Sequence, residues 1–265
     1  MRMTKFKLWR AAGAALVLGL AACGGEGGEN GGERGQAGAS GEGGEAGEAA
    51  SPPAPEAASA GGEAGEAGAA TAYAGVDGAQ LTAMRLQHLK GFVLVAQQVA
   101  ASGASEEAEV LVQQGLLEVY DPATAAFGGF NVAPVRAAGA DAAALAAAAQ
   151  AIDAARAPLT YDHAALTARM VDIATGLYQG VNQADFVDPI EYQHSLGAAL
   201  AARDALVSGR TALEHSNARA YREAVAELDR FIALWPAVSA PEHPASYAQV
   251  LAQGSRVRFA LSPYL

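Results

Sequence analysis

One histidine-containing stretch occurs twice in this alanine-rich chain, 106 residues apart. Residues 87–96 read QHLKGFVLVA and residues 193–202 read QHSLGAALAA, so that the same Gln, His, Gly, Leu and Ala stand at matching places. A neutral imidazole is a common ligand for metal ions, including the iron of haem. We therefore consider His88 and His194 as candidate ligands for iron, haem or copper. The alternative is a pair of histidines that hydrogen-bond inside a packed core.

A carboxylate accompanies the second histidine. Glu191 stands three residues before His194, and an E-x-x-H sequence on a helix places both groups on one face, as in di-iron carboxylate bundles. Such a site needs a second copy, but Arg85 occupies the matching position in the first stretch. Glu191 also ends the sequence DPIE, which has the spacing of a helix-capping box. Metal binding and helix capping are therefore both open for Glu191.

A glycine follows each histidine after three residues. Within a helix, Gly91 and Gly197 would each cost about 1 kcal/mol relative to alanine, so that something should offset the cost. A close helix crossing is the simplest reason, because a glycine lets a neighbouring backbone approach. Histidine at i and glycine at i+3 share a helix face. We therefore expect a seam between two helices, with His88 and His194 facing each other across it.

The elements that would position these residues are helices. From residue 73 onward, apolar residues recur with the 3.6-residue period, and the alternation typical of strands is almost absent. Short connections between amphipathic helices predict an all-α antiparallel bundle. Because the repeated stretch opens the first and the fifth helix, an internal duplication predicts two pseudo-symmetric halves, 73–180 and 181–265.

About seven helices are expected from cap and stop signals, at 77–101, 105–120, 141–157, 160–180, 188–207, 217–235 and 244–261. Their expected N-caps include Ser105, Asp141, Thr160, Asp188 and either Ser216 or Asn217. Alanine buries little apolar area, so larger side chains must anchor the core. The expected anchors are Leu86, Phe92, Leu94, Leu111, Leu116, Leu117, Tyr120, Phe127, Tyr178, Tyr192, Leu196, Phe231 and Trp235.

The N-terminal sequence predicts export and a lipid anchor. A basic start is followed by twelve uncharged residues, 11–22, which is too short to span a bilayer but typical of a secretory signal. The run ends in LAAC, which resembles the lipobox of bacterial lipoproteins. That resemblance implies that residues 1–22 are removed and that Cys23 carries the lipid. Because Gly24 rather than Asp follows the cysteine, we expect an outer-membrane location, facing the periplasm or the cell surface.

Composition narrows the expected partners. Residues 23–72 consist almost entirely of Gly, Ala, Glu, Ser and Pro, and predict a disordered tether. The net charge of −11 argues against nucleic-acid binding, which needs Lys and Arg to neutralise phosphates. Cys23 is the only cysteine, so the chain can form neither an intrachain disulfide nor a cysteine-based zinc or iron–sulfur site. No nucleophile elbow, phosphate-binding loop or HExxH motif is present, and we expect a non-catalytic protein.

The exported, alanine-rich pair of helical halves resembles the imelysin-type periplasmic iron-uptake proteins in architecture. That family carries a Gly-x-His-x-x-Glu motif at its seam, whereas Gly91 and Gly197 stand here where the motif has Glu, so no binding residue is carried over. The chain also resembles bacterial lipoproteins with a Gly/Glu-rich tether before a helical domain. These resemblances imply a ligand such as iron or haem and a partner such as an outer-membrane transporter. The alternative is a structural lipoprotein that docks another envelope protein.

Overall fold

The computed structural model describes residues 69–183 and 186–265, and these form a bundle of helices. Their only strand-like feature is an isolated bridge between Asn182 and Val187. The predicted all-α fold is confirmed. The signal sequence, Cys23 and the tether up to residue 68 lie outside the described residues. Within the described ranges, no helix combines the length and the apolar character needed to cross a membrane.

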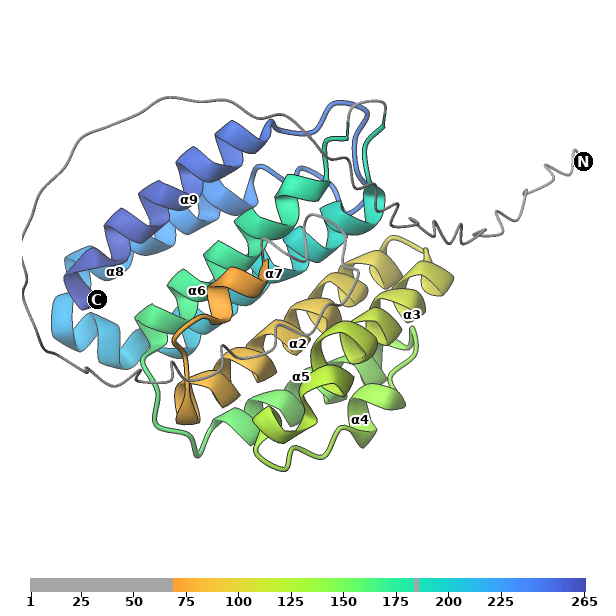
Figure 1. Cartoon of the computed structure of the whole chain (residues 1–265), viewed down its shortest axis with the longest axis horizontal. Coiled ribbons are helices and arrows are strands. Elements are labelled where there is room, and N and C mark those ends of the chain that lie inside the picture. The colour runs from red at the N-terminus through yellow and green to blue at the C-terminus, as the bar shows by residue number, and fades with distance from the viewer. Residues whose placement is uncertain (1–68, 184–185) are drawn as a thin grey trace, which may run out of the picture. The chain divides into compact units, whose positions relative to one another are not determined.

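Helix α2 opens one group of helices, which lies together in Figure 1. It packs against α3 and α5, and the chain between these two helices runs through short π, 3₁₀ and α segments. The members of this group are α2 (Gly78–Ala101), α3 (Ser105–Gln114), η2 (Gly115–Tyr120), η3 (Asp121–Phe127), α4 (Ala133–Arg136) and α5 (Ala142–Arg156).

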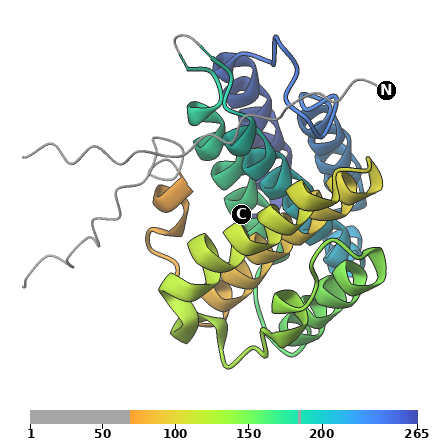
Figure 2. The ribbon, with the colours of Figure 1, turned by 90° about the vertical axis from the view of Figure 1, so that its right-hand side faces the viewer.

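Helix α7 is the centre of the second group and also makes its main contact with the first. It packs on α6, on α8 and on α2, while α6 packs further on α9 (Figures 1 and 2). The predicted halves, 73–180 and 181–265, place α6 in the N-terminal one, whereas its packing groups it with the C-terminal helices. The members are α6 (His163–Leu177), η4 (Tyr178–Gly180), α7 (Pro189–Ser208), α8 (Arg210–Ile232), α9 (Tyr247–Leu261) and η5 (Ser262–Tyr264).

Two of the expected N-caps, Asp141 and Asp188, stand where the sequence places them. Asp141 caps α5 and Asp188 caps α7, each through a side-chain oxygen that accepts backbone N–H groups of the first turn. The cap of α6 is Asp162 rather than the predicted Thr160. The cap of α9 is Ser246, which forms a capping box with Gln249, two residues beyond the predicted start.

Two other expected starts differ. Ser105 makes no capping hydrogen bond and is itself the first residue of α3. Asn217 does cap a helix, since its side-chain oxygen accepts the backbone N–H of Ala220 at 3.1 Å. It does so at a kink inside α8, where its φ is −157° and its ψ is 88°, because the chain from Arg210 onward is already helical.

The core is largely the predicted one, with one clear error. Leu117 is 68% exposed, although Leu116 beside it is buried. The 3.6-residue period assumes that α3 continues unchanged to Tyr120, whereas residues Gly115–Tyr120 form a π-helical turn. A π turn holds more residues than an α turn and rotates the following side chains to another face. Leu94 and Tyr120 are only partly buried; the other predicted anchors are buried.

The folded part begins earlier than expected. Residues 69–72, which the sequence places in the tether, contribute two buried side chains, Ala69 and Ala72. The short helix η1 (Thr71–Tyr73) packs against α6, and Arg169 of α6 donates a hydrogen bond to the carbonyl of Ala72. This segment is ordered although its side chains are small, because Arg169 binds its backbone at Ala72 and Tyr73 contacts His88 of α2.

Candidate functional site

The two repeated glycines lie against each other where α2 crosses α7. A Cβ atom on Gly91 would lie 2.7 Å from the carbonyl oxygen of Gly197, and one on Gly197 would lie 2.8 Å from that of Gly91. Such distances are too short for real carbon atoms, so any side chain at either place would push the helices apart. The close crossing therefore accounts for the helix propensity that each glycine gives up.

The two histidines belong to one cluster at this crossing, and they contact different polar partners. The ring of Phe92 contacts both, at centroid distances of 5.7 Å from His88 and 4.8 Å from His194. Nδ1 of His88 lies 2.7 Å from the hydroxyl of Tyr73, whereas Nε2 of His194 lies 3.0 Å from Oε1 of Gln114. Each imidazole thus has its own polar partner, with Phe92 in contact with both rings.

Both imidazoles are neutral at neutral pH. Burial lowers the pKa of His88 to about 3, and the nearby positive charge of Arg85 and the second histidine add to the effect. Burial also lowers the pKa of His194 to about 4, against a small opposing effect of Asp188. Neutral imidazoles can donate and accept hydrogen bonds at the same time, so tautomers here depend on the neighbours.

A cavity of about 380 Å³ lies beside His88, and we call it the Arg85–His88 cavity. Its polar lining comes from Tyr73, Arg85, His88 and Glu118. The rest of its wall is apolar, and consists of Ala69, Ala70, Phe92, Leu117, Val119, Pro122 and Leu177. It is thus a mostly apolar pocket with a few polar groups from α2, η1 and η2, which is the usual make-up of a small-molecule site.

The polar groups of this cavity are connected. The guanidinium carbon of Arg85 lies 4.0 Å from the centre of the Tyr73 ring, in a cation–π arrangement. Tyr73 in turn contacts His88 through its hydroxyl. Burial raises the pKa of Tyr73 far above its ordinary value, despite the charge and hydrogen bond of Arg85, so the phenol stays protonated. Nε of Arg85 and Nε2 of His88 are buried and have no hydrogen-bond partner among the described residues.

The predicted metal ligands do not converge. His194 is not part of the cavity wall, and Nδ1 of this ring lies 3.6 Å from a carboxylate oxygen of Glu118. Glu191 is buried at the start of α7, where its backbone N–H donates to Asp188 and its side chain packs against Gly180. In the described part of the chain, no three His, Cys, Asp or Glu side chains are grouped so that they could hold a metal ion.

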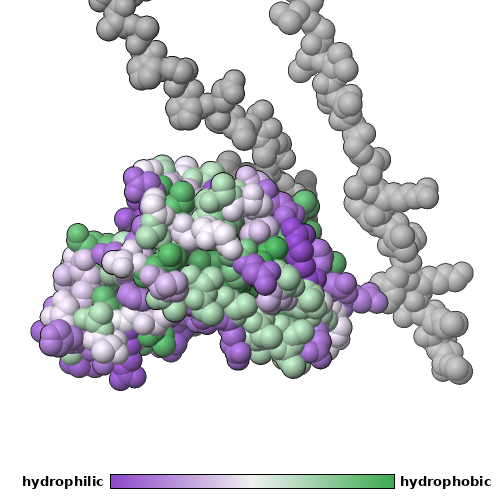
Figure 3. All heavy atoms as spheres, turned by 90° about the horizontal axis from the view of Figure 1, so that it is seen from below, coloured by the Kyte–Doolittle hydropathy of each residue, from purple (hydrophilic) through white to green (hydrophobic). Residues whose placement is uncertain are grey.

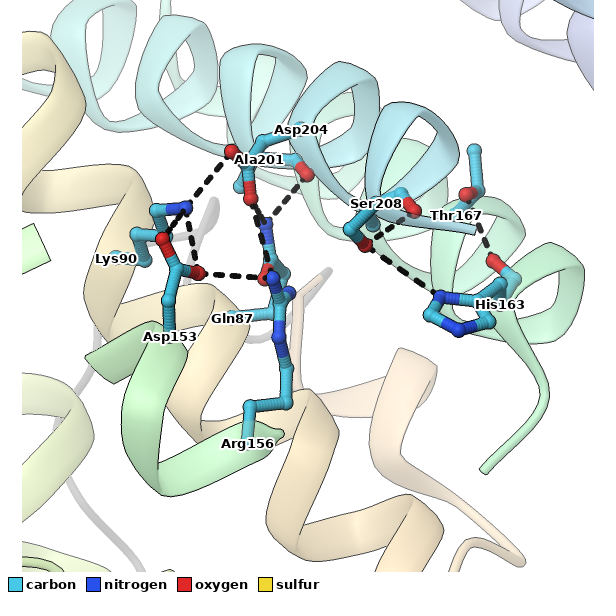
Figure 4. Close-up of polar contacts among 10 residues, drawn as sticks. Gln87, Lys90, Asp153, Arg156, His163, Thr167, Ala201, Asp204 and Ser208 are labelled. Atoms are coloured by element: carbon cyan, nitrogen blue, oxygen red, sulfur yellow. Dashed lines mark hydrogen bonds and ion pairs between the residues drawn. The ribbon is translucent and has the colours of Figure 1, made fainter. Parts of the chain in front are cut away.

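A second polar cluster lies on another face of α2 (Figure 4), and the sequence reasoning missed it. Nζ of Lys90 lies 2.7 Å from carboxylate oxygens of both Asp153 and Asp204. Arg156 reaches the same two carboxylates at 3.0 and 3.4 Å. Gln87 completes the cluster by donating to Asp204 and to the carbonyl of Ala201. The cluster therefore ties α2, α5 and α7 together through two cations and two carboxylates.

In this cluster, the cost of burying charged groups is offset by their attraction to groups of opposite charge. Lys90 and Arg156 are 4% and 3% exposed, so each is a buried cation. Burial alone would raise the pKa of Asp204, but hydrogen bonds from Lys90 and Gln87 and the charges of Lys90 and Arg156 hold this pKa below its ordinary value. A cavity of about 440 Å³ adjoins the cluster and is also lined by Tyr161, His163 and Ser208.

Comparison with protein-family models, with curated proteins and with solved structures finds no match for this chain. The class of protein is therefore defined by the fold and the site alone. It is an all-α bundle in which two helices cross at paired glycines, with a mostly apolar cavity beside the crossing.

Proposed function

We propose that this chain is a lipid-anchored envelope protein whose helical domain binds a small organic molecule in the Arg85–His88 cavity. One observation carries the ligand-binding part: a partly buried arginine and a neutral, buried histidine share the wall of a mostly apolar cavity. The anchor rests on the sequence around Cys23, and the proposed location is the outer membrane, facing the periplasm or the cell surface.

If the protein binds iron, we propose that it binds the metal as an organic complex such as haem. A free ion needs several protein ligands at about 2 Å, and the described residues provide no such group. Haem, in contrast, is an apolar plane with acidic substituents and could be held by contacts with the cavity wall. On this proposal the protein presents its ligand near the outer membrane, where an uptake transporter would be the natural partner.

The anchor is tested by Cys23→Ser in the full chain. We expect the variant to move from the membrane fraction to the soluble fraction after export, because the lipid is lost. Retention of the variant in the membrane fraction would refute the lipid assignment.

Ligand binding is tested with a neutral fluorescent probe, 1-aminoanthracene, on the full chain carrying Cys23→Ser. Ala70 is exposed and lines the cavity, so Ala70→Trp should fill the pocket without disturbing the core. We expect probe fluorescence to rise with the parent chain and to be lost with Ala70→Trp. Ala101→Trp, at an exposed place at the end of α2, is the matched control and should bind normally.

A haem titration distinguishes the roles of the two histidines. If haem occupies the cavity, His88→Ala should weaken binding, whereas His194→Ala should leave it unchanged, because His194 is not part of the wall. Equal losses in the two variants would instead support the hypothesis that His88 and His194 are both ligands.

The alternative is a non-catalytic lipoprotein that docks another envelope protein. Large apolar side chains are exposed on α3, η2 and α9, namely Val110, Leu117 and Phe259, at 53%, 68% and 82%. On the face shown in Figure 3, apolar surface alternates with hydrophilic side chains rather than forming one continuous patch. Failure of both the probe and haem to bind would favour this alternative.

A further inference from the structure

We propose that the Arg85–His88 cavity takes an apolar molecule that ends in a carboxylate, such as a fatty acid. The inference rests on the proposed function, that is, on the cavity being a small-molecule site. It concerns the chemical class of the ligand, and it follows from the charge, the hydrogen-bond donors and the walls of the cavity.

The charge of Arg85 is the first argument. Among the described residues Arg85 forms no ion pair, and its positive end lies over the Tyr73 ring at the cavity wall. The buried cations Lys90 and Arg156 in contrast each meet the carboxylates of Asp153 and Asp204. Removing a cation from water without an anion is costly, and an anionic ligand would offset this cost. A planar guanidinium is also the side chain best shaped to hold a carboxylate through two hydrogen bonds.

The hydrogen-bond donors are the second argument. The guanidinium of Arg85 lies over the Tyr73 ring, and the protonated Tyr73 hydroxyl, 2.7 Å from Nδ1 of His88, can donate to that nitrogen. A neutral His88 then carries its proton on Nε2, which has no partner. Because Arg85 and His88 thus both offer donors, the complementary ligand group is an acceptor.

Glu118 is the acid that lies on this wall, and it lies toward the other histidine. One of its carboxylate oxygens is 3.6 Å from Nδ1 of His194, on α7. Glu118 reduces the attraction for an anion without occupying Arg85 in an ion pair. Its replacement by glutamine should therefore strengthen binding of an acid.

The walls are the third argument. Phe92, Val119 and Leu177 are buried side chains that line the cavity, and Leu117 beside them is 68% exposed. An apolar chain in the cavity would cover Leu117 and remove further apolar surface from water, which favours binding. The cavity of about 380 Å³ lies in the usual range for small-molecule sites.

The test compares dodecanoate with dodecan-1-ol, which has the same chain but no charge. Each displaces 1-aminoanthracene from the full chain carrying Cys23→Ser. We expect dodecanoate to displace the probe at a concentration about tenfold lower, since one charge-assisted pair contributes on the order of 1.5 kcal/mol. Arg85→Met should remove this advantage and leave the alcohol unchanged, and Glu118→Gln should increase it. Arg222→Met, at an exposed position on α8, is the matched control.

Arg85→Lys guards against misfolding of the methionine variant, because it keeps the charge but loses the planar group. It should bind dodecanoate more weakly than the parent and more tightly than Arg85→Met. Haem and its dimethyl ester, titrated in parallel, distinguish a free fatty acid from the acidic groups of haem as the source of the carboxylate.

The outcomes separate the two proposals. Equal displacement by acid and alcohol, or no loss of acid binding in Arg85→Met, would overturn the carboxylate while leaving the small-molecule site intact. No binding of 1-aminoanthracene, dodecanoate or haem would overturn the site itself.

Discussion

Two faces of helix α2 treat positive charge differently. On one face, Lys90 and a neighbouring arginine from α5 are buried, and each forms ion pairs with the same two aspartates. On the other face, Arg85 is partly buried beside an apolar cavity and has no ion pair among the described residues. The comparison separates two uses of a buried cation: one joins helices, whereas the other is available to a ligand.

The largest expected loss of stability comes from breaking the ion pairs of Lys90. Lys90→Met would leave Asp153 and Asp204 without their closest cation, 2.7 Å away. Breaking a buried pair costs about 3–5 kcal/mol, and the partial exposure of both aspartates lowers this to about 2–4 kcal/mol. Urea denaturation measures the change in unfolding free energy. Arg219→Met, which breaks an exposed pair with Glu223, should have no measurable effect; equal effects would remove the distinction between buried and exposed pairs.

Acid should lower the stability of the protein, because two buried histidines lie at the crossing of α2 and α7. The folded pKa values of about 3 for His88 and about 4 for His194 lie below the ordinary value of 6.5. The unfolded chain therefore binds more protons, and stability falls as the pH drops from 6.5 toward 4. Each histidine should cost about 1–2 kcal/mol at pH 5. His88→Gln should reduce the slope of unfolding free energy against pH, and an unchanged slope would contradict a buried neutral His88.

A larger residue in place of either glycine at the crossing of α2 and α7 should destabilise the protein. Gly91→Ala places a Cβ 2.7 Å from the carbonyl oxygen of Gly197, so the helices must separate. Overpacking costs about 1–3 kcal/mol, and the gain in helix propensity offsets about 1 kcal/mol of it, leaving a net loss of up to about 2 kcal/mol. The double variant with Gly197→Ala should lose less than the sum of the single variants, because one separation accommodates both methyl groups. Strict additivity in thermal or urea unfolding would indicate that the two glycines act independently.

The smallest effect is expected at Arg85. Arg85→Met breaks no ion pair among the described residues, so its unfolding free energy should change by no more than about 0.5 kcal/mol. The contrast with Lys90→Met is the sharpest form of the comparison. A loss as large as that of Lys90→Met would mean that Arg85 is a structural cation, and the ligand argument would lose its basis.

Local patterns predicted most of the fold, because each helix shows its period and its cap in adjacent residues. Asp141 and Asp188 were identified by cap chemistry alone, and Gly91 and Gly197 suggested a crossing because a glycine in a helix needs a reason. The π turn at Gly115–Tyr120 was missed, since nothing in its composition separates it from an α-helix, and Leu117 was misplaced with it.

The candidate site was harder to predict, because its residues meet only through tertiary packing. Arg85 appeared in the sequence as a mismatch with Glu191, whereas in the structure it lines the cavity. Lys90 stands in an apolar stretch, and a charge in such a place could have indicated burial with partners. The identity of those partners, Asp153 and Asp204, depends on how α5 and α7 pack, which no local pattern records.

The most direct test of the central claim is the thermal unfolding of the chain with and without saturating dodecanoate, in the parent and in Arg85→Met. A ligand that binds only the folded state raises the melting temperature by mass action. We predict a clear rise for the parent and a much smaller one for Arg85→Met, with dodecan-1-ol shifting both alike. Equal shifts with dodecanoate in the two proteins, or no shift in either, would contradict the account.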